Sequence, residues 1–317
     1  MRSLHVTERD GRYTVQLVER DIPRPAAGEV LVRVAASGLN RADLSQIAGR
    51  YPPPPGESDI LGLELSGHVA ESGAAVCALV AGGAHAEYAA VPEGQLFPAP
   101  RSLDLVRAAG IPEAYLTAFV NLVGTAALER GQRVLIHAGA SGVGLAAIAL
   151  ARFLGAAVAA TTRSPEKVQA LIQAGATLAL QTPKDDVAAA VEHAWGTNAI
   201  DVVLDPVGGP GMEQNLRVLA TGGRIVVIAT LGGARPEIDL SLLMRKRAAV
   251  IGSTLRARSR AEKARLVSRF RAEVLPGFDD GRLGVVVDTV YPPARAGEAL
   301  QRMRENQSVG KLLIAWP

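Results

Sequence analysis

The stretch VLIHAGASGVGLAAIALARFLGA, residues 134–156, joins an apolar strand pattern to an apolar helical pattern through a glycine-rich run. Gly139, Gly142 and Gly144 fall within six residues, in the order G-A-S-G-V-G. In a doubly wound sheet, the loop after the first strand opens a helix whose free N–H groups and positive dipole end attract a pyrophosphate. The flanking strand and helix favour this interpretation over a purely structural turn. The residues expected at the phosphates are Ala140, Ser141, Gly142 and Val143.

The region that follows alternates apolar strand patterns with helical patterns. Near-continuous apolar strands separated by helices predict a parallel sheet covered on both faces, which is the doubly wound or Rossmann arrangement. The predicted strands lie at residues 133–138, 156–161, 177–181, 201–206, 223–230 and 248–254.

The first third of the chain is rich in strand and loop patterns. The pattern of residues 29–40 predicts a strand that ends at Gly38, and residues 59–70 predict another. Residues 78–91 predict a hairpin with Gly82-Gly83 as its turn. Four consecutive prolines within residues 49–59 exclude a helix or a central strand there. A helix is expected to begin near Pro112. Residues 285–317 return to strand, helix and strand, and we expect them to pack on the first domain, which makes the nucleotide domain an insertion.

The amino-acid composition excludes several classes of protein. The 317 residues are 48% hydrophobic, which is enough for a packed core, and the formal charge of +3 is too balanced to indicate a nucleic-acid binder. The single cysteine, Cys77, excludes a disulfide framework and a cysteine-rich zinc site. No apolar run reaches the roughly 18 residues of a membrane helix, and the first residues lack a signal core. A cytoplasmic protein is therefore expected.

The end of the second strand of this fold distinguishes the two nicotinamide cofactors. An NAD site usually carries Asp or Glu there for the ribose hydroxyls, whereas this chain has Thr162, Arg163 and Lys167. Arginine and lysine beside hydroxyls suit a 2′-phosphate, so the sequence favours NADPH over NADH. The nearby Glu166 is interpreted as a helix-dipole residue after Ser164-Pro165. The alternative for Arg163 and Lys167 is a solvated helix start.

Several motifs together resemble one known family. GLNRADLSQIAGRYPPPPGESDILGLELSG, IPEAYLTAF, VLIHAGASGVG, RKRAAVIGSTLRARS and VGKLLI are similar to the zinc-independent quinone oxidoreductases of the medium-chain dehydrogenase/reductase superfamily, most of all to the p53-inducible quinone oxidoreductase branch. The resemblance implies a GroES-like catalytic domain, residues 1–118 and 258–317, around a Rossmann domain, residues 119–257. It also implies NADPH in the cleft between them, a homodimer, and metal-free reduction of quinones or polarised C=C bonds.

The zinc ligands of related dehydrogenases are replaced in this chain. Asn40 stands where those relatives have Cys, and Leu63 stands where they have His. Leucine cannot bind zinc and asparagine is a poor ligand, so no metal site is expected. The five histidines show no short paired spacing and are interpreted as strand or surface residues.

Site residues follow from the resemblance. Asn40 is implied to lie beside the nicotinamide and to hydrogen-bond the acceptor oxygen, with a turn-capping role as the alternative. Tyr51 is implied to contact the substrate, with simple packing as the alternative, and Asp43 is expected to pin its loop rather than transfer protons. The remaining residues assigned to the cofactor are Thr117, Gly208, Leu231, Gly232, Ser253 and Lys311.

The chain departs from the family pattern in two places, and His85 lies at a position that varies within the family. The connection near Gly73 is about ten residues shorter than is usual, which either shortens a surface hairpin or opens a wall of the catalytic domain. Thr182 replaces a tyrosine that often holds the adenosine phosphate, and Arg163 could compensate. His85 would influence the acceptor if it faced the cleft.

Two other functions remain open at this point. One is a biosynthetic enoyl-type reductase specialised on one metabolite. The other is a dinucleotide-binding sensor or structural protein with little turnover. Asn40, Tyr51 and the proline loop favour catalysis, because a sensor needs only the Rossmann half.

Overall fold

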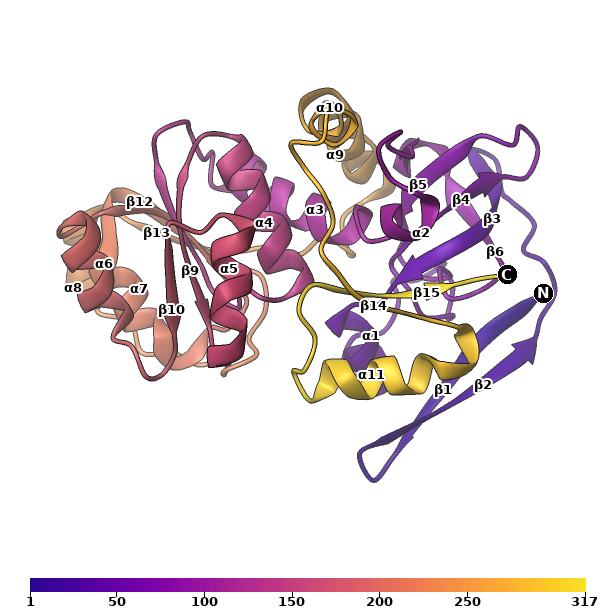
Figure 1. The fold of residues 1–317 in the computed structure, drawn as a ribbon, viewed down its shortest axis with the longest axis horizontal. Coiled ribbons are helices and arrows are strands. Elements are labelled where there is room, and N and C mark those ends of the chain that lie inside the picture. Colours follow the sequence, from indigo (N-terminus) through magenta and orange to yellow (C-terminus); the bar gives the residue numbers. More distant parts are fainter. The chain divides into compact units, whose positions relative to one another are not determined.

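A computed structural model describes the backbone of residues 1–317 and all side chains except that of Pro210. The chain divides into two compact units (Figure 1). The first, here the catalytic unit, comprises Met1–Leu116 and Leu255–Pro317, and the second, here the nucleotide unit, comprises Thr117–Thr254. The second unit is therefore inserted into the first along the sequence.

The nucleotide unit contains a six-stranded sheet in the order β10-β9-β8-β11-β12-β13, with every pair parallel. The strands are β8 (Arg133–Ile136), β9 (Ala157–Thr162), β10 (Leu178–Gln181), β11 (Ile200–Asp205), β12 (Leu219–Val227) and β13 (Ala249–Gly252). The order reverses between β8 and β11, which is the topological switch point where open α/β sheets bind ligands. The predicted Rossmann arrangement is confirmed.

Helices cover both faces of this sheet, because its strands are apolar on both sides (Figure 1). Helices α4 and α5 contact each other, as do α6 and α7. The helical segments are η2 (Val120–Thr125, a π-helix), α4 (Gly142–Phe153), η3 (Pro165–Lys167), α5 (Val168–Ala174), α6 (Val187–Trp195), η4 (Gly209–Gly211), α7 (Met212–Val218) and α8 (Leu240–Lys246).

The catalytic unit is built on a seven-stranded sheet in the order β14-β15-β3-β4-β5-β7, with β6 also paired to β3 and a separate β1–β2 ribbon. Its strands are β1 (Arg2–Arg9), β2 (Arg12–Glu19), β3 (Glu29–Gly38), β4 (Glu64–Val69), β5 (Ala75–Leu79), β6 (Tyr88–Pro92), β7 (Leu96–Pro98), β14 (Val287–Tyr291) and β15 (Lys311–Ala315). Its helices are α1 (Arg41–Ile47), η1 (Glu93–Gln95), α2 (Leu105–Ala108), α3 (Pro112–Phe119, which ends in the nucleotide unit), α9 (Arg260–Glu273), α10 (Leu275–Asp279), η5 (Pro293–Arg295) and α11 (Ala296–Arg304).

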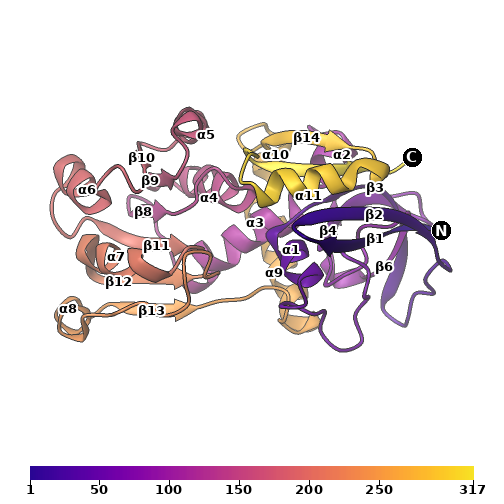
Figure 2. The same ribbon diagram turned by 90° about the horizontal axis from the view of Figure 1, so that it is seen from below.

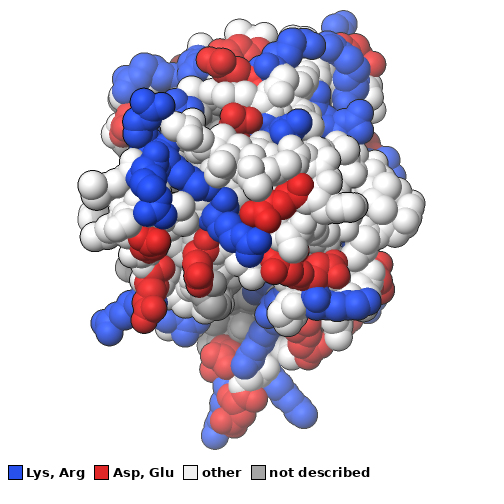
Figure 3. Space-filling model, turned by 90° about the vertical axis from the view of Figure 1, so that its left-hand side faces the viewer, with Lys and Arg blue, Asp and Glu red and all other residues white. Residues whose placement is uncertain are grey.

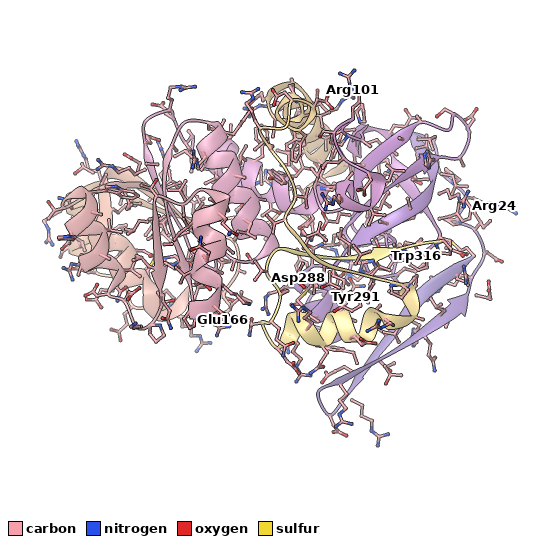
Figure 4. All side chains as sticks on the ribbon, in the orientation of Figure 1. Arg24, Arg101, Glu166, Asp288, Tyr291 and Trp316 are labelled. Atoms are coloured by element: carbon pink, nitrogen blue, oxygen red, sulfur yellow. The ribbon has the colours of Figure 1, made fainter. Side chains whose placement is uncertain are left out.

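The C-terminal segment completes this sheet, as predicted. Strand β15 pairs antiparallel with β3, and Leu313 lies opposite Gly38. Helix α11 of the same segment packs on β2 (Figure 2). Trp316 donates from Nε1 to the Ser37 hydroxyl over 3.3 Å, and its side chain lies in the same hydrophobic core as Val32 and Leu312 (Figure 4). The last residues of the chain therefore belong to the fold of the first.

The predicted hairpin at residues 78–91 is wrong. Strand β5 pairs with β4 and β7, whereas β6 pairs with β3. The Gly82-Gly83 step instead packs on the segment before β4: Gly83 N–H donates to the Ile60 carbonyl over 2.8 Å. A Cβ on Gly82 would lie 2.3 Å from the Ser58 carbonyl oxygen. The two glycines thus allow their backbone to approach residues 58–60 closely. A Gly-Gly pair required for such an approach cannot be distinguished in sequence from a hairpin turn.

The short connection near Gly73 is the turn of a regular hairpin. Strands β4 and β5 pair antiparallel from Glu64 opposite Leu79 to His68 opposite Ala75. Gly73 N–H donates to the Val69 carbonyl over 2.8 Å. The structure therefore places the shortened connection in a surface hairpin.

Charges of both signs lie side by side on the surface drawn in Figure 3. Among the described residues, no helix combines the length and the apolar character needed to cross a bilayer.

Candidate functional site

The glycine loop of the nucleotide unit connects β8 to α4 at the carboxyl edge of the sheet. Ser141 is the N-cap of α4, and its Oγ accepts a hydrogen bond from Gly144 N–H over 3.0 Å. The hydroxyl proton of Ser141 stays available to donate. Gly142 and Val143 occupy the first helical turn, where backbone N–H groups have no acceptor within the helix. Free N–H groups at the positive end of a helix dipole suit an anionic ligand.

Two of the three glycines serve packing within the protein. A Cβ on Gly144 would lie 2.5 Å from the Ala138 carbonyl oxygen, and one on Gly139 would lie 3.1 Å from Ala160 Cβ. Ala138 adopts a positive φ of 50°, so the loop turns sharply before the helix. Gly139 and Gly144 therefore make room for the neighbouring strand and loop, which in turn leaves the first N–H groups of α4 at the loop surface.

The end of β9 carries the residues predicted to distinguish the two cofactors. Thr162 is 5% exposed and Lys167 is 7% exposed, whereas the Arg163 side chain is exposed. Thr182 N–H donates to the Thr162 carbonyl over 2.8 Å, so Thr182 lies at the same edge of the sheet. Glu166 is exposed at the start of the following helical turn (Figure 4). Arg163 is thus an accessible cation at this strand end.

The loops after β11 and β12 are joined by backbone hydrogen bonds. Leu231 N–H donates to the Pro206 carbonyl over 3.2 Å, and Gly232 N–H donates to the Val207 carbonyl over 2.7 Å. Gly208 has a φ of 61°, and a Cβ there would lie 2.9 Å from the Gly233 carbonyl oxygen. The predicted residues Gly208, Leu231 and Gly232 therefore form one connected surface, on which the Leu231 side chain is 56% exposed.

Two further predicted cofactor residues lie in the nucleotide unit. Thr117 is 8% exposed on α3. Ser253 follows β13, and its Oγ is buried with no hydrogen-bond partner among the described residues. A buried hydroxyl of this kind is suited to a ligand group that the protein itself does not supply.

Asn40 and Lys311 are in direct contact in the catalytic unit. Lys311 Nζ donates to Asn40 Oδ1 and to the Leu39 carbonyl, each over 2.9 Å, and forms an ion pair with the buried Glu64. Asn40 Nδ2 donates to Glu64 Oε1 over 3.0 Å and to the Gly38 carbonyl over 3.2 Å. Both amide hydrogens of Asn40 are therefore used within the protein, and its Oδ1 accepts from Lys311.

Asp43 pins two segments, as predicted. Its carboxylate accepts from Asn40 N–H over 2.7 Å, which caps α1, and from Gly62 N–H over 3.1 Å. His85 is fully buried, with Nδ1 2.8 Å from the Ser37 hydroxyl and Nε2 3.6 Å from Asp43 Oδ2. His85 thus lies in the interior of the catalytic unit, and its suggested influence on the acceptor stays a prediction.

Tyr51 is held by Arg256, a residue that the sequence did not single out. Arg256 is 4% exposed, and its guanidinium carbon lies 5.1 Å from the centre of the Tyr51 ring. It donates to the Tyr51 carbonyl over 3.0 Å, to the Ala81 carbonyl over 2.7 Å and to Gln46 Oε1 over 2.7 Å. Burial, with the charge of Glu113, raises the pKa of the Tyr51 phenol above its ordinary value of 10.0. Tyr51 is therefore a neutral O–H donor at physiological pH.

Glu113 and Glu64 are the other groups that the sequence analysis missed. Glu113 N–H donates to Glu64 Oε2 over 2.8 Å. Burial, followed by the Glu64 charge, raises the pKa of the Glu113 carboxyl to about 8. A carboxylate at residue 64, inside the apolar run ILGLELSG, is the signal that could have identified this cluster, because buried acids need partners.

No group of three or more His, Cys, Asp or Glu side chains in the described part of the chain is arranged to hold a metal ion.

Two family models match the chain, one in each part of the sequence. The alcohol dehydrogenase GroES-like domain matches residues 26–101, and the zinc-binding dehydrogenase model matches residues 142–271. A segment of polyketide synthase GfsB from Streptomyces halstedii is 33% identical over 301 residues, which cover 92% of this chain and 5% of that protein.

The full-length similarities agree on one family. Quinone oxidoreductase-like protein 2 from Bos taurus is 30% identical over 310 residues, which cover 94% of this chain and 88% of that protein. The quinone oxidoreductase of Thermus thermophilus, whose structure is also known as a complex with NADPH, superposes with a TM-score of 0.82 at 34% identity, with 100% of both chains covered. The chain belongs to the quinone oxidoreductase family of the medium-chain dehydrogenase/reductase superfamily.

Proposed function

We propose that this protein is an NADPH-dependent reductase of quinones or of activated C=C bonds. The observation that carries the proposal is the pairing of an anion-binding helix start at Gly142–Val143 with an accessible Arg163 at the end of β9. The buried, unpartnered Ser253 hydroxyl at the same edge of the sheet fits a ligand that supplies the missing hydrogen bond. The NADPH complex of the Thermus thermophilus relative supports the same assignment.

The choice of NADPH over NADH depends on Arg163. A guanidinium can contact the 2′-phosphate with two N–H groups, and NADH has no such phosphate. We expect Arg163→Ala to raise the Kd of NADPH by about tenfold, the effect of losing one charge-assisted contact, and to leave NADH nearly unchanged. Fluorescence titration of both cofactors measures this, with Arg130→Ala as control, because Arg130 is exposed and precedes β8 at the opposite edge of the sheet. Tighter binding of NADH than NADPH by the unaltered protein would overturn the assignment.

Bound NADPH supplies the hydride, and the residues of the catalytic unit serve the acceptor. Asn40 has no amide hydrogen left to donate to the acceptor, because both are used within the protein. The neutral Tyr51 phenol is the better donor to a quinone or enone oxygen, where negative charge develops after hydride transfer. This division of roles refines the expectation that Asn40 itself binds the acceptor oxygen.

A panel of acceptors tests the activity. Purified protein is mixed with NADPH and a series of quinones, enones and enoyl thioesters while the nicotinamide absorbance is followed. We expect turnover with quinones or enones. The similarity to a polyketide synthase segment favours the biosynthetic enoyl reductase as second candidate, and turnover with enoyl thioesters alone would select it. Tight NADPH binding without any turnover would select the sensor instead.

We further propose a homodimer acting in the cytoplasm. Strand β13 lies at the edge of the nucleotide sheet, with Val250 37% exposed, and Leu240 and Met244 on α8 are 65% and 75% exposed. An open strand edge beside apolar side chains suits pairing with a second copy. The buried Cys77, the sole cysteine, is consistent with a reducing compartment.

A further inference from the structure

A chain of buried polar side chains crosses the carboxyl ends of three strands in the nucleotide unit. His137, which follows β8, lies with Nδ1 3.0 Å from Thr161 Oγ1 on β9 and with Nε2 2.6 Å from Asn215 Oδ1 on α7. Asn215 Nδ2 in turn donates to Asp205 Oδ2 at the end of β11 over 3.1 Å. Asn215 and Asp205 are each 1% exposed, Thr161 is 2% and His137 is 9% exposed.

The direction of each hydrogen bond follows from the chemistry of the groups. A carboxylate only accepts, so Asn215 presents its Nδ2 to Asp205 and its Oδ1 to His137. The imidazole must then donate from Nε2–H, and the neutral ring accepts at Nδ1 from the Thr161 hydroxyl. All donors thus point the same way, from Thr161 through His137 and Asn215 to Asp205. Reversing the His137–Asn215 or the Asn215–Asp205 bond alone would place two acceptors or two donors face to face, whereas the Thr161 hydroxyl can donate or accept.

The chain ends at the turn that carries Gly208. Asp205 Oδ1 accepts from Val207 N–H over 2.7 Å and from Gly208 N–H over 2.8 Å. The Pro206 and Val207 carbonyls of this turn hold Leu231 and Gly232 through backbone hydrogen bonds, as described above. The His137 ring is therefore linked, through three successive hydrogen-bonded groups, to the surface predicted to wall the nicotinamide.

We propose that His137 is a positioning residue that fixes the nicotinamide end of the dinucleotide site through Asn215 and Asp205. The assignment rests on the proposed function, because the role of the Gly208–Gly232 surface belongs to it. Backbone hydrogen bonds also hold the segment that carries this ring and leads into the glycine loop. His137 N–H donates to the Leu204 carbonyl over 3.1 Å, and Gly139 N–H donates to the Thr161 carbonyl over 2.7 Å. One imidazole thus couples the geometry of the glycine loop to that of the Gly208 turn.

The tautomer of His137 tests the donor chain without reference to function. Selective labelling of histidine with ¹⁵N allows NMR to distinguish Nε2–H from Nδ1–H, and the signals lost in His137→Gln identify the ring. We expect a single Nε2–H tautomer in the protein alone. An Nδ1–H tautomer, or exchange between the two forms, would overturn the proposal.

The variant Asn215→Asp tests the positioning role. The introduced carboxyl lies against Asp205, so at about pH 8 two negative charges repel, whereas at about pH 6 a shared proton replaces the lost N–H donor. Within the hydrogen-bonded series from Thr161 to Asp205, the titratable groups are His137 and Asp205. We expect hydride transfer from bound NADPH to fall by about tenfold to a hundredfold at the higher pH, as for a small misplacement of reacting groups. At the lower pH, the rate of hydride transfer in the variant should return toward that of the unaltered protein. The affinity for NADPH should change little at either pH.

Asn198→Asp is the matched control, because Asn198 is exposed on a loop of the same unit and gains the same charge. It should retain the rate and pH dependence of the unaltered protein. An equal loss of rate in Asn215→Asp at both pH values would show that the hydrogen-bonded side chains only stabilise the fold, and it would overturn the proposal. Failure of the unaltered protein to bind NADPH would instead refute the proposed function, and the tautomer experiment separates the two results.

Discussion

At the scale of single residues, the catalytic unit is characterised by charged side chains that the fold buries and pairs. Lys311 contacts Asn40 and Glu64 through a side chain that is 4% exposed. The expectation that Lys311 reaches the cofactor stays a prediction, and the structure adds that this lysine orients Asn40. Buried polar groups of this kind have large effects when one partner is removed, because the remaining partner is left unsatisfied.

Arg256 provides the first test at this scale. The change Arg256→Met leaves the Ala81 and Tyr51 carbonyls without their donor and removes the cation from the Tyr51 ring. We expect the free energy of unfolding in urea to fall by about 1–3 kcal/mol, the cost of buried unsatisfied groups. The exposed Arg265→Met is the control, and equal losses in both variants would contradict this role.

Glu113 gives the stability a pH dependence with a defined sign. Burial raises the pKa of its carboxyl from 4.5 to about 8, so the folded protein keeps a proton that the unfolded chain releases. The contribution is complete below the unfolded pKa and is lost as the pH rises through the folded pKa. We expect Glu113→Gln to raise the free energy of unfolding above about pH 8, by a few kcal/mol at most.

Urea titrations of the unaltered protein and Glu113→Gln from about pH 6 to about pH 9 measure this difference. The exposed Glu71→Gln serves as control and should keep the slope of the unaltered protein. If Glu113→Gln also kept that slope, the carboxyl would titrate normally in the folded state and the cluster around Glu64 would be described wrongly.

At the scale of elements, the start of α4 is set by backbone contacts that tolerate no side chain. In Gly144→Ala the new Cβ would lie 2.5 Å from the Ala138 carbonyl oxygen, so the loop must shift. Overpacking of this kind costs about 1–3 kcal/mol. Because the shift falls on the loop proposed to hold the phosphates, we expect the Kd of NADPH to rise, by about fivefold to 150-fold if the whole cost is carried into binding. Calorimetric titration with NADPH measures this effect.

Gly124→Ala is the control for that experiment. Its Cβ would meet Val120 Cγ2 at 3.7 Å, an ordinary contact, within a helical segment where alanine is the better residue. We expect unchanged NADPH affinity. Equal affinity in Gly144→Ala as well would show that the loop can accommodate a side chain and that its glycines are not needed.

At the scale of the whole molecule, the proposed homodimer can be tested beside the edge strand β13. Met244 is 75% exposed on α8, next in sequence to this strand. Light scattering should show a dimer for the unaltered protein and a shift toward monomer for Met244→Lys, because a charge would be desolvated at the interface. Ile172→Lys, which changes a side chain 49% exposed on α5, should leave the dimer intact. A monomeric unaltered protein would refute the proposed homodimer.

The sequence by itself determined the architecture of the nucleotide unit and the return of the C-terminal segment, because hydrophobic period and glycine position are local signals. The GroES-like arrangement of the catalytic unit came from the family resemblance. The six parallel strands, the helix from Pro112 and the return of residues 285–317 all follow from such patterns. Asp43 as a loop anchor was also predictable, since an acid three residues after Asn40 suits a helix start.

Only the tertiary structure decided which distant residues meet. The Gly82-Gly83 step looked like a hairpin turn but packs on the segment at Ile60. The partners of Asn40, the hold of Arg256 on Tyr51 and the chain through His137 join residues far apart in sequence. Their identity depends on which strand ends and loops the fold brings together. Sequence patterns specify how each segment buries its own apolar face, whereas hydrogen-bond partners of buried polar groups depend on contacts between segments.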